Sequence, residues 1–208
     1  MKKYLIIIIL FLFILPVVCN ATSAILISDQ HTGTKKNVKM NMGIFQNKVS
    51  EIRDKKPDII ISCGDEAYNG EISMYAIMNK MDGIVWVKGD DDGKKYNLSP
   101  ANYTKDFDDV RVIVLDDSNG KLSGSQINFL KNAEDTEKDV IIAMHVPPLN
   151  KNVKPDLKKW KTFYPALTPN VKMVVSGHWH AYRRTTWNGI KFIVVPPMFK
   201  GQYLIENL

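Results

Sequence analysis

The residues PDIIISCGD, at positions 57–65, decide the fold of this chain. Pro57 ends any helix that precedes it, and the apolar run after Asp58 predicts a short buried strand. Gly64 and Asp65 follow at the carboxyl end of that strand. Sites in α/β sheets lie at this edge, so Asp65 is a candidate functional residue.

Strand and helix patterns alternate on both sides of this stretch. Apolar runs of strand length predict further buried strands, at 24–28, 83–87, 111–115, 139–144 and 171–176. Helical spacing predicts helices from 41 to the stop at Pro57, at 71–81, and after Ser123, which resembles an N-cap with Gln126 three residues on. The residues 89–108 are polar and predict a loop.

A hairpin is predicted late in the chain. Asn188 and Gly189 separate two strand patterns, at 183–187 and 190–195, and this dipeptide favours a two-residue turn. Alternating strands and helices followed by a hairpin predict a mixed α/β sandwich. A length of 208 residues fits one domain, assigned to 22–208.

The N-terminal segment, residues 1–21, has the pattern of an export signal. Lys2 and Lys3 precede an unbroken apolar run from Tyr4 to Cys19, and small residues follow it around Ala21. Cleavage after Ala21 predicts a secreted or periplasmic protein. Two alternatives stay open: an uncleaved membrane anchor, or lipidation of Cys19. Contact with a membrane is expected only through this segment.

Charge and cysteine content narrow the possible functions. Removing residues 1–21 takes away two lysines and no acids, which lowers the formal charge from +6 to +4. This excess mildly favours anionic substrates, but no basic helix or aromatic ladder indicates a nucleic-acid partner. Only Cys63 then remains, so no intrachain disulfide is possible. Cys63 completes an apolar strand without a local base, which indicates a core residue rather than a nucleophile.

All four histidines of the chain lie near the ends of predicted strands, together with clusters of aspartates. The histidines are His31, His145, His178 and His180, and the aspartates are Asp29, Asp65, Asp90, Asp91 and Asp92. Imidazole nitrogen with carboxylate oxygen suits zinc, manganese or iron better than calcium or magnesium alone. Each residue is a weak signal by itself, but four histidines at strand ends together favour a metal site.

These histidines and aspartates fall in five short sequence blocks. In their order along the chain, from about Ile25 to Pro197, the blocks resemble those of calcineurin-like metallophosphoesterases. The matching blocks are Ser28-Asp29-Gln30-His31, Gly64-Asp65, Gly89-Asp90-Asp91-Asp92, Met144-His145 and Gly177-His178-Trp179-His180. The stretch from Leu115 to Leu130 also looks like the family's segment before the fourth block. The resemblance implies a single-domain α/β sandwich of two mixed β-sheets flanked by helices. It also implies hydrolysis of a small phosphoester, as a phosphomonoesterase or a phosphodiesterase.

The resemblance further implies a two-metal site that holds two divalent transition-metal ions (Mn, Zn or Fe). Asp65 would bridge the two ions, which can then clamp a phosphoryl group for in-line attack. The remaining implied ligands are Asp29, His31 and His180 for the first ion, and Asp90, His145 and His178 for the second.

The third block departs from the family pattern. Asp90 replaces an asparagine, and Asp91 replaces the histidine that contacts the phosphate and assists the leaving group. Asp91 is therefore the candidate catalytic residue. An aspartate with the reference pKa of ~3.9 is ionised at neutral pH, so it is a poorer acid than histidine and repels phosphate. This change leaves open an alternative: a catalytically weakened relative that binds metal and acts as a binding protein.

The substrate and the oligomeric state are not predicted by the sequence. The segments 91–110 and 149–170 flank the expected site and should select the substrate. The second of them contains Trp160, Phe163 and Tyr164 together with several lysines.

Overall fold

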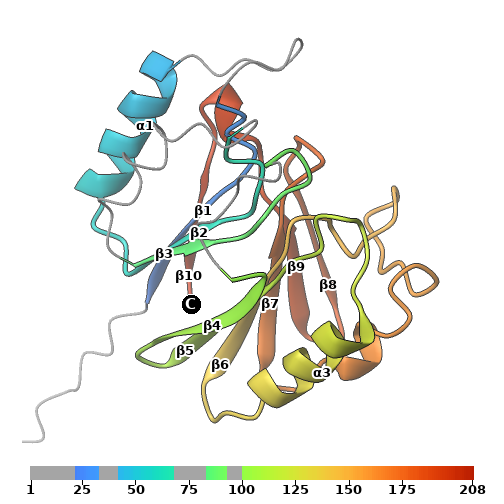
Figure 1. Ribbon diagram of the computed structural model, residues 1–208. Coiled ribbons are helices and arrows are strands. Elements are labelled where there is room, and N and C mark those ends of the chain that lie inside the picture. The colour runs from blue at the N-terminus through green and yellow to red at the C-terminus, as the bar shows by residue number, and fades with distance from the viewer. Residues whose placement is uncertain (1–21, 33–41, 68–82, 93–99) are drawn as a thin grey trace, which may run out of the picture.

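The computed structural model describes residues 22–32, 42–67, 83–92 and 100–208, with the side chains of 42–44 excepted (Figure 1). The predicted signal at 1–21 and the predicted helix at 71–81 lie outside these ranges. Neither described helix has the length and apolar character needed to cross a bilayer.

Two mixed sheets face each other (Figure 1). The first sheet has the order β10-β1-β2-β3, and its strands are β1 (Ser23–Ile27), β2 (Ile59–Ser62), β3 (Ile84–Trp86) and β10 (Leu204–Asn207). The second has the order β4-β5-β6-β7-β9-β8, and its strands are β4 (Asn102–Phe107), β5 (Val110–Leu115), β6 (Asp139–Ala143), β7 (Val171–Ser176), β8 (Arg183–Trp187) and β9 (Ile190–Val194). This is the predicted α/β sandwich.

Helices cover the outer faces of the sandwich. The helix α1 (Met42–Asp54) lies against the first sheet, and α3 (Gly124–Ala133) lies against the second. Two short 3-10 turns complete the described elements, η1 (Tyr164–Ala166) and η2 (Met198–Lys200). The alternation of side chains along β1 shows the layering, because Ala24 and Leu26 face the second sheet while Ile25 and Ile27 face α1.

The parallel strands all point toward one edge. Strands β1, β2 and β3 are parallel in the first sheet, and β5, β6, β7 and β9 are parallel in the second. The antiparallel strands β10, β4 and β8 are edge strands. The loops after seven parallel strands therefore meet at one end of the sandwich, where α/β folds place their sites.

Most of the predicted elements that fall in the described ranges are confirmed. Ser123 caps α3 in a capping box with Gln126. Asn188 and Gly189 both have positive φ, at 49° and 80°, as a type I′ hairpin turn requires.

Two strands were missed. The loop predicted at 89–108 is wrong in part, because β4 occupies 102–107 and pairs with β5 over its whole length. Its polar sequence NYTKDF suits an edge strand, which a search for apolar runs overlooks. The C-terminal strand β10 was not predicted either, and it pairs antiparallel with β1.

Candidate metal centre

The seven predicted ligands come together at the carboxyl edge of the parallel strands. They form two groups, each with donor atoms within 4.8 Å of one another. The first group contains Asp29, His31, Asp65 and His180, and the second contains Asp90, His145 and His178. The division into two groups is the same as the predicted division into two ligand sets.

Asp65 lies between the two groups. Its Oδ2 atom is 3.5 Å from Nε2 of His31 in the first group and 3.5 Å from Nε2 of His145 in the second. Burial opposes ionisation of this carboxyl, but the hydrogen bond and charge of His145 hold the pKa of Asp65 below its usual range. One carboxylate oxygen therefore faces imidazoles of both groups.

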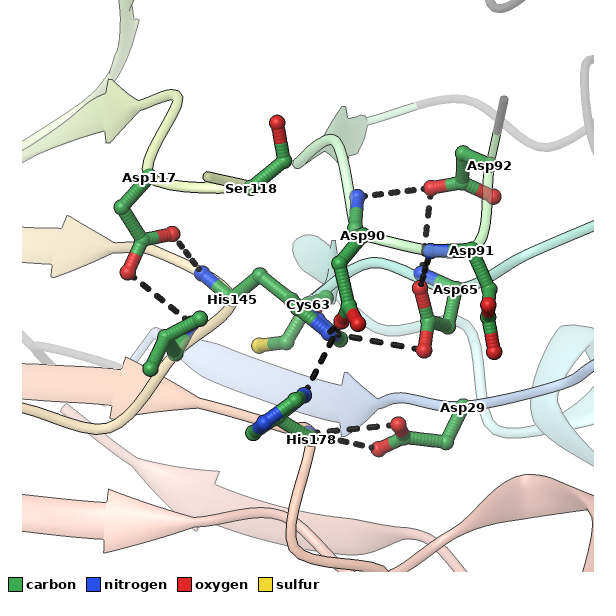
Figure 2. Close-up of polar contacts among 12 residues, drawn as sticks. Asp29, Cys63, Asp65, Asp90, Asp91, Asp92, Asp117, Ser118, His145 and His178 are labelled. Atoms are coloured by element: carbon green, nitrogen blue, oxygen red, sulfur yellow. Dashed lines mark hydrogen bonds and ion pairs between the residues drawn. The ribbon is translucent and has the colours of Figure 1, made fainter. Parts of the chain in front are cut away.

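His145 is held from two sides (Figure 2). Its Nδ1 lies 2.7 Å from the carbonyl oxygen of Cys63, which can only accept, so Nδ1 carries a proton and Nε2 faces the site. Asp117 accepts the backbone N–H groups of His145 and Val146 at 2.7 and 2.9 Å. Such outer contacts fix the tautomer and orientation of a ligating imidazole.

The second group is a close cluster of opposite charges. Oδ1 of Asp90 lies 2.8 Å from Nε2 of His145 and 2.9 Å from Nδ1 of His178. These two hydrogen bonds drive the pKa of Asp90 far below its usual range. Burial opposes a charge on His145, but contacts with Asp65 and Asp90 raise the pKa of its imidazole well above the usual value.

The first group is built on Asp29. Its Oδ2 accepts hydrogen bonds from the Ser28 hydroxyl at 2.6 Å and from the backbone N–H of His178 at 3.1 Å. Its Oδ1 lies 3.3 Å from Nε2 of His180, and the hydrogen bond to Asp29 raises the pKa of that imidazole. The Nε2 atoms of His31 and His180 lie 3.0 Å apart, and burial lowers the pKa of His31.

The backbone at this edge is strained. Eight described residues other than glycine have positive φ, and five of them are predicted ligands. Those five are Asp29 (51°), His31 (45°), Asp65 (56°), His178 (68°) and His180 (51°). Left-handed backbone at such residues costs about 1–3 kcal/mol each and persists where the surrounding structure enforces it, which is typical of functional sites.

Two glycines permit the close approach of the loops. A Cβ on Gly64, whose φ is +93°, would lie 2.5 Å from Nδ1 of His145. A Cβ on Gly177 would lie 1.8 Å from the Ser28 hydroxyl oxygen and 2.8 Å from Oδ2 of Asp29. No other residue type fits at either position without displacing a predicted ligand.

The donor set fits divalent metal ions. Imidazole nitrogens with convergent lone pairs, such as those of His31 and His180, repel unless a cation or a proton lies between them. Three carboxylates and four imidazoles provide the N/O mixture of zinc, manganese and iron sites.

The predicted catalytic residue, Asp91, lies beside the first group. Its backbone N–H donates to Oδ1 of Asp65 at 2.8 Å, and its Oδ2 is 3.8 Å from Nδ1 of His31. The side chain is 21% exposed, so a ligand can reach it.

Asp92 and Asp117 are site residues to which the sequence assigned no role. Asp92 is fully buried and accepts backbone N–H groups of Asp65, Ala67 and Gly89 at 2.7–3.1 Å, so it joins two site loops. Burial raises the pKa of Asp92, and it raises that of Asp117 to about 7. Asp117 comes two residues after β5, just as Asp29 comes two residues after β1. This position after a buried strand is the sequence signal that could have identified Asp117 as a site residue.

Cys63 is a core residue, as expected. It is fully buried and packs among apolar side chains between the two sheets. Burial raises the pKa of its thiol well above the usual value, which opposes a nucleophilic role.

Comparisons with known proteins agree with this geometry. A family model described as calcineurin-like phosphoesterase matches residues 23–182. A comparison with curated proteins finds no match.

Several solved structures share the fold. A dimetal phosphatase from Danio rerio has a TM-score of 0.68 at 13% identity, with 91% of this chain and 93% of that chain covered. The purple acid phosphatase PPD1 from yellow lupin has a TM-score of 0.63 at 15% identity, with coverages of 90% and 46%. GAP50, described as the anchor in the inner membrane complex of Plasmodium, has a TM-score of 0.55 at 16% identity, with coverages of 83% and 70%.

At these identities the structural likeness concerns the fold alone. The family match covers most of the chain and includes all seven predicted ligands. The chain therefore belongs to the calcineurin-like phosphoesterase family, a family of metal-dependent hydrolases of phosphoester bonds.

Proposed function

We propose that this protein hydrolyses a small phosphoester with two divalent transition-metal ions, manganese, zinc or iron. The observation that carries the proposal is the position of Asp65, whose Oδ2 lies 3.5 Å from an imidazole nitrogen of each ligand group. Two cations close together repel strongly, so a shared carboxylate between the two groups supports a paired site.

Each of the two ligand groups would hold one of the two ions. Asp29, His31 and His180 would hold one ion, and Asp90, His145 and His178 the other, with Asp65 shared. Bound divalent ions would polarise the phosphoryl group and activate water for in-line attack. Asp117 and the Cys63 carbonyl keep His145 oriented, and Asp92 keeps the Asp65 loop in place.

Turnover of p-nitrophenyl phosphate and bis(p-nitrophenyl) phosphate by manganese-loaded protein tests the proposal. The wild-type protein should hydrolyse at least one of these esters, and chelation should abolish the activity. Asp65→Asn should lower metal occupancy in both groups and reduce turnover, whereas Asp135→Asn, at an exposed turn, should change neither. Metal loss from one group only would argue against a bridging Asp65.

A binding protein is the second candidate. The observation that favours it is Asp91, whose carboxylate lies 3.8 Å from Nδ1 of His31 and stands where the family pattern has a histidine that assists the leaving group. The fold of GAP50, the anchor in the inner membrane complex of Plasmodium, is similar. Metal occupancy without turnover of either aryl ester would support this candidate over the hydrolase.

We also propose that the mature protein acts outside the cytoplasmic membrane. The support is the basic pair Lys2-Lys3, the apolar run and the small residues around Ala21. Strand β1 begins at Ser23, so cleavage after Ala21 would leave every described strand intact. N-terminal sequencing should find Thr22 first. A lipidated Cys19 would indicate a lipoprotein, and Met1 in the membrane fraction would contradict cleavage.

A further inference from the structure

The turn η2 is attached directly to the first ligand group. Met198 is fully buried, and its backbone N–H donates to the carbonyl oxygen of Ser28 at 2.7 Å. The N–H of Phe199 donates to the carbonyl oxygen of Asp29 at 3.3 Å. Gly201, with φ of 74°, ends the turn. The segment lies beyond residue 182, where the family match ends.

Phe199 and Lys200 lie beside the imidazoles of the first group. The ring of Phe199 packs edge-on against His31 and His180, with centroid distances of 5.8 and 5.1 Å. The ammonium of Lys200 lies over the same ring, 5.5 Å from its centroid. The Lys200 ammonium and the two imidazoles therefore contact the same aromatic ring.

Lys200 lies beside the first ligand group, because its ammonium and the imidazole of His180 contact the same aromatic ring. Lys200 is exposed and forms no ion pair in the described part of the chain, whereas Lys48 pairs with Glu51 and Arg184 with Glu206. An ammonium without an acidic partner at the rim of an acidic cluster is available to an anion.

We propose that Lys200 binds the phosphoryl oxygens of the substrate and so favours phosphomonoesters over phosphodiesters. The inference rests on the proposed hydrolase function. A monoester carries a charge near −2 at pH 8, because its second pKa is about 6, whereas a diester carries −1. The Coulomb attraction to one ammonium is therefore about twice as large for the monoester.

Substitution of Lys200 tests this preference with two esters that share a leaving group. Lys200→Met should raise KM for p-nitrophenyl phosphate about tenfold, and for bis(p-nitrophenyl) phosphate about threefold, with kcat less affected. Lys200→Arg should restore the monoester KM. The matched control is Lys172→Met, an exposed lysine on β7, which should leave both KM values unchanged. An equal rise for both esters, or none, would overturn the inference.

Binding of inorganic phosphate separates this inference from the proposed function. Calorimetry on manganese-loaded protein should show phosphate affinity about tenfold weaker in Lys200→Met than in wild type. If neither ester is hydrolysed but phosphate binding depends on Lys200, the hydrolase proposal fails and the anion site stands. If both proteins bind phosphate equally, Lys200 is not the anion-binding residue, whether or not the wild type is active.

Discussion

Nδ1 of His145 donates a hydrogen bond to the carbonyl oxygen of Cys63 over 2.7 Å, which leaves Nε2 as the atom that faces Asp65 and Asp90. The contact joins the end of β2 to the end of β6, so the two sheets together set the direction of the ligand. In the metal-free protein Nε2 must carry a proton to pair with Asp90, and a metal ion would displace that proton.

Metal affinity should therefore rise with pH. Contacts with Asp65 and Asp90 raise the pKa of His145 well above its usual value, so a proton on the imidazole competes with the metal. In the pH range where metal binding releases one proton, the affinity of the second group for manganese should increase about tenfold per pH unit. Calorimetry between pH 6 and 8 measures this. His145→Gln should bind weakly with less pH dependence, and a pH-independent wild type would contradict the prediction.

Asp117 should act as a positioning residue for the second group. Removing its carboxylate leaves the backbone N–H groups of His145 and Val146 unpaired in the interior, at a cost of about 1–3 kcal/mol each. Asp117→Ala should weaken metal binding at the second group about 10–100-fold and leave the first group occupied. Metal titration with elemental analysis measures both. Asp116→Asn is the control, because Asp116 bonds to Ser118 rather than to His145. Equal loss at both groups would indicate general unfolding instead.

Asp91 should set the leaving-group dependence of hydrolysis. A carboxylate donates a proton poorly, so esters with poor leaving groups should react slowly. Asp91→His should raise kcat for an alkyl phosphate more than for an aryl phosphate. A Brønsted plot over a series of leaving groups gives the slope for each variant. An equal effect on all esters would show that Asp91 does not occupy the position of an acid.

Glu134 should destabilise the fold at neutral and alkaline pH. Its side chain is buried, its Oε1 has no hydrogen-bond partner among the residues that the structure describes, and its Oε2 accepts the N–H of Thr168 at 3.0 Å. Burial raises the pKa of Glu134 above its unfolded value, so its contribution to stability is greatest at low pH and is lost as pH rises through the folded pKa. Glu134→Gln should therefore raise Tm at pH 8 and have less effect near pH 4. Thermal melts measure both.

Glu137→Gln is the matched control for this variant, because Glu137 is an exposed glutamate close to it in sequence. Its effect on Tm should be small and equal at the two pH values. A larger gain for Glu134→Gln at pH 4 than at pH 8 would reverse the expected sign.

The clustering of the site residues was predicted from the sequence more accurately than the strands at the edges of the sheets. Asp29, Asp65 and His145 each follow an apolar run, and the meeting of parallel strands at one edge brought them together as expected. Strand β4 escaped prediction because none of its residues is buried, and its pairing with β5 depends on a long-range register.

The sequence also did not reveal the roles of residues that act through contacts with distant parts of the chain. Asp117 is separated from His145 by 28 residues, and no local pattern reveals that its carboxylate accepts two backbone N–H groups there. Phe199 and Lys200 follow β9 at the site edge, but their closeness to His180 comes from the hydrogen bonds that attach η2 to the β1 loop. Such contacts are set by the packing of the two sheets.

Anomalous diffraction from manganese-loaded crystals tests the two-metal proposal most directly. Two peaks about 3.5–4 Å apart should appear, with Oδ2 of Asp65 between them. One should be bound by Asp29, His31 and His180, and the other by Asp90, His145 and His178. A single peak, or two peaks that do not share Asp65, would contradict a bridged two-metal centre.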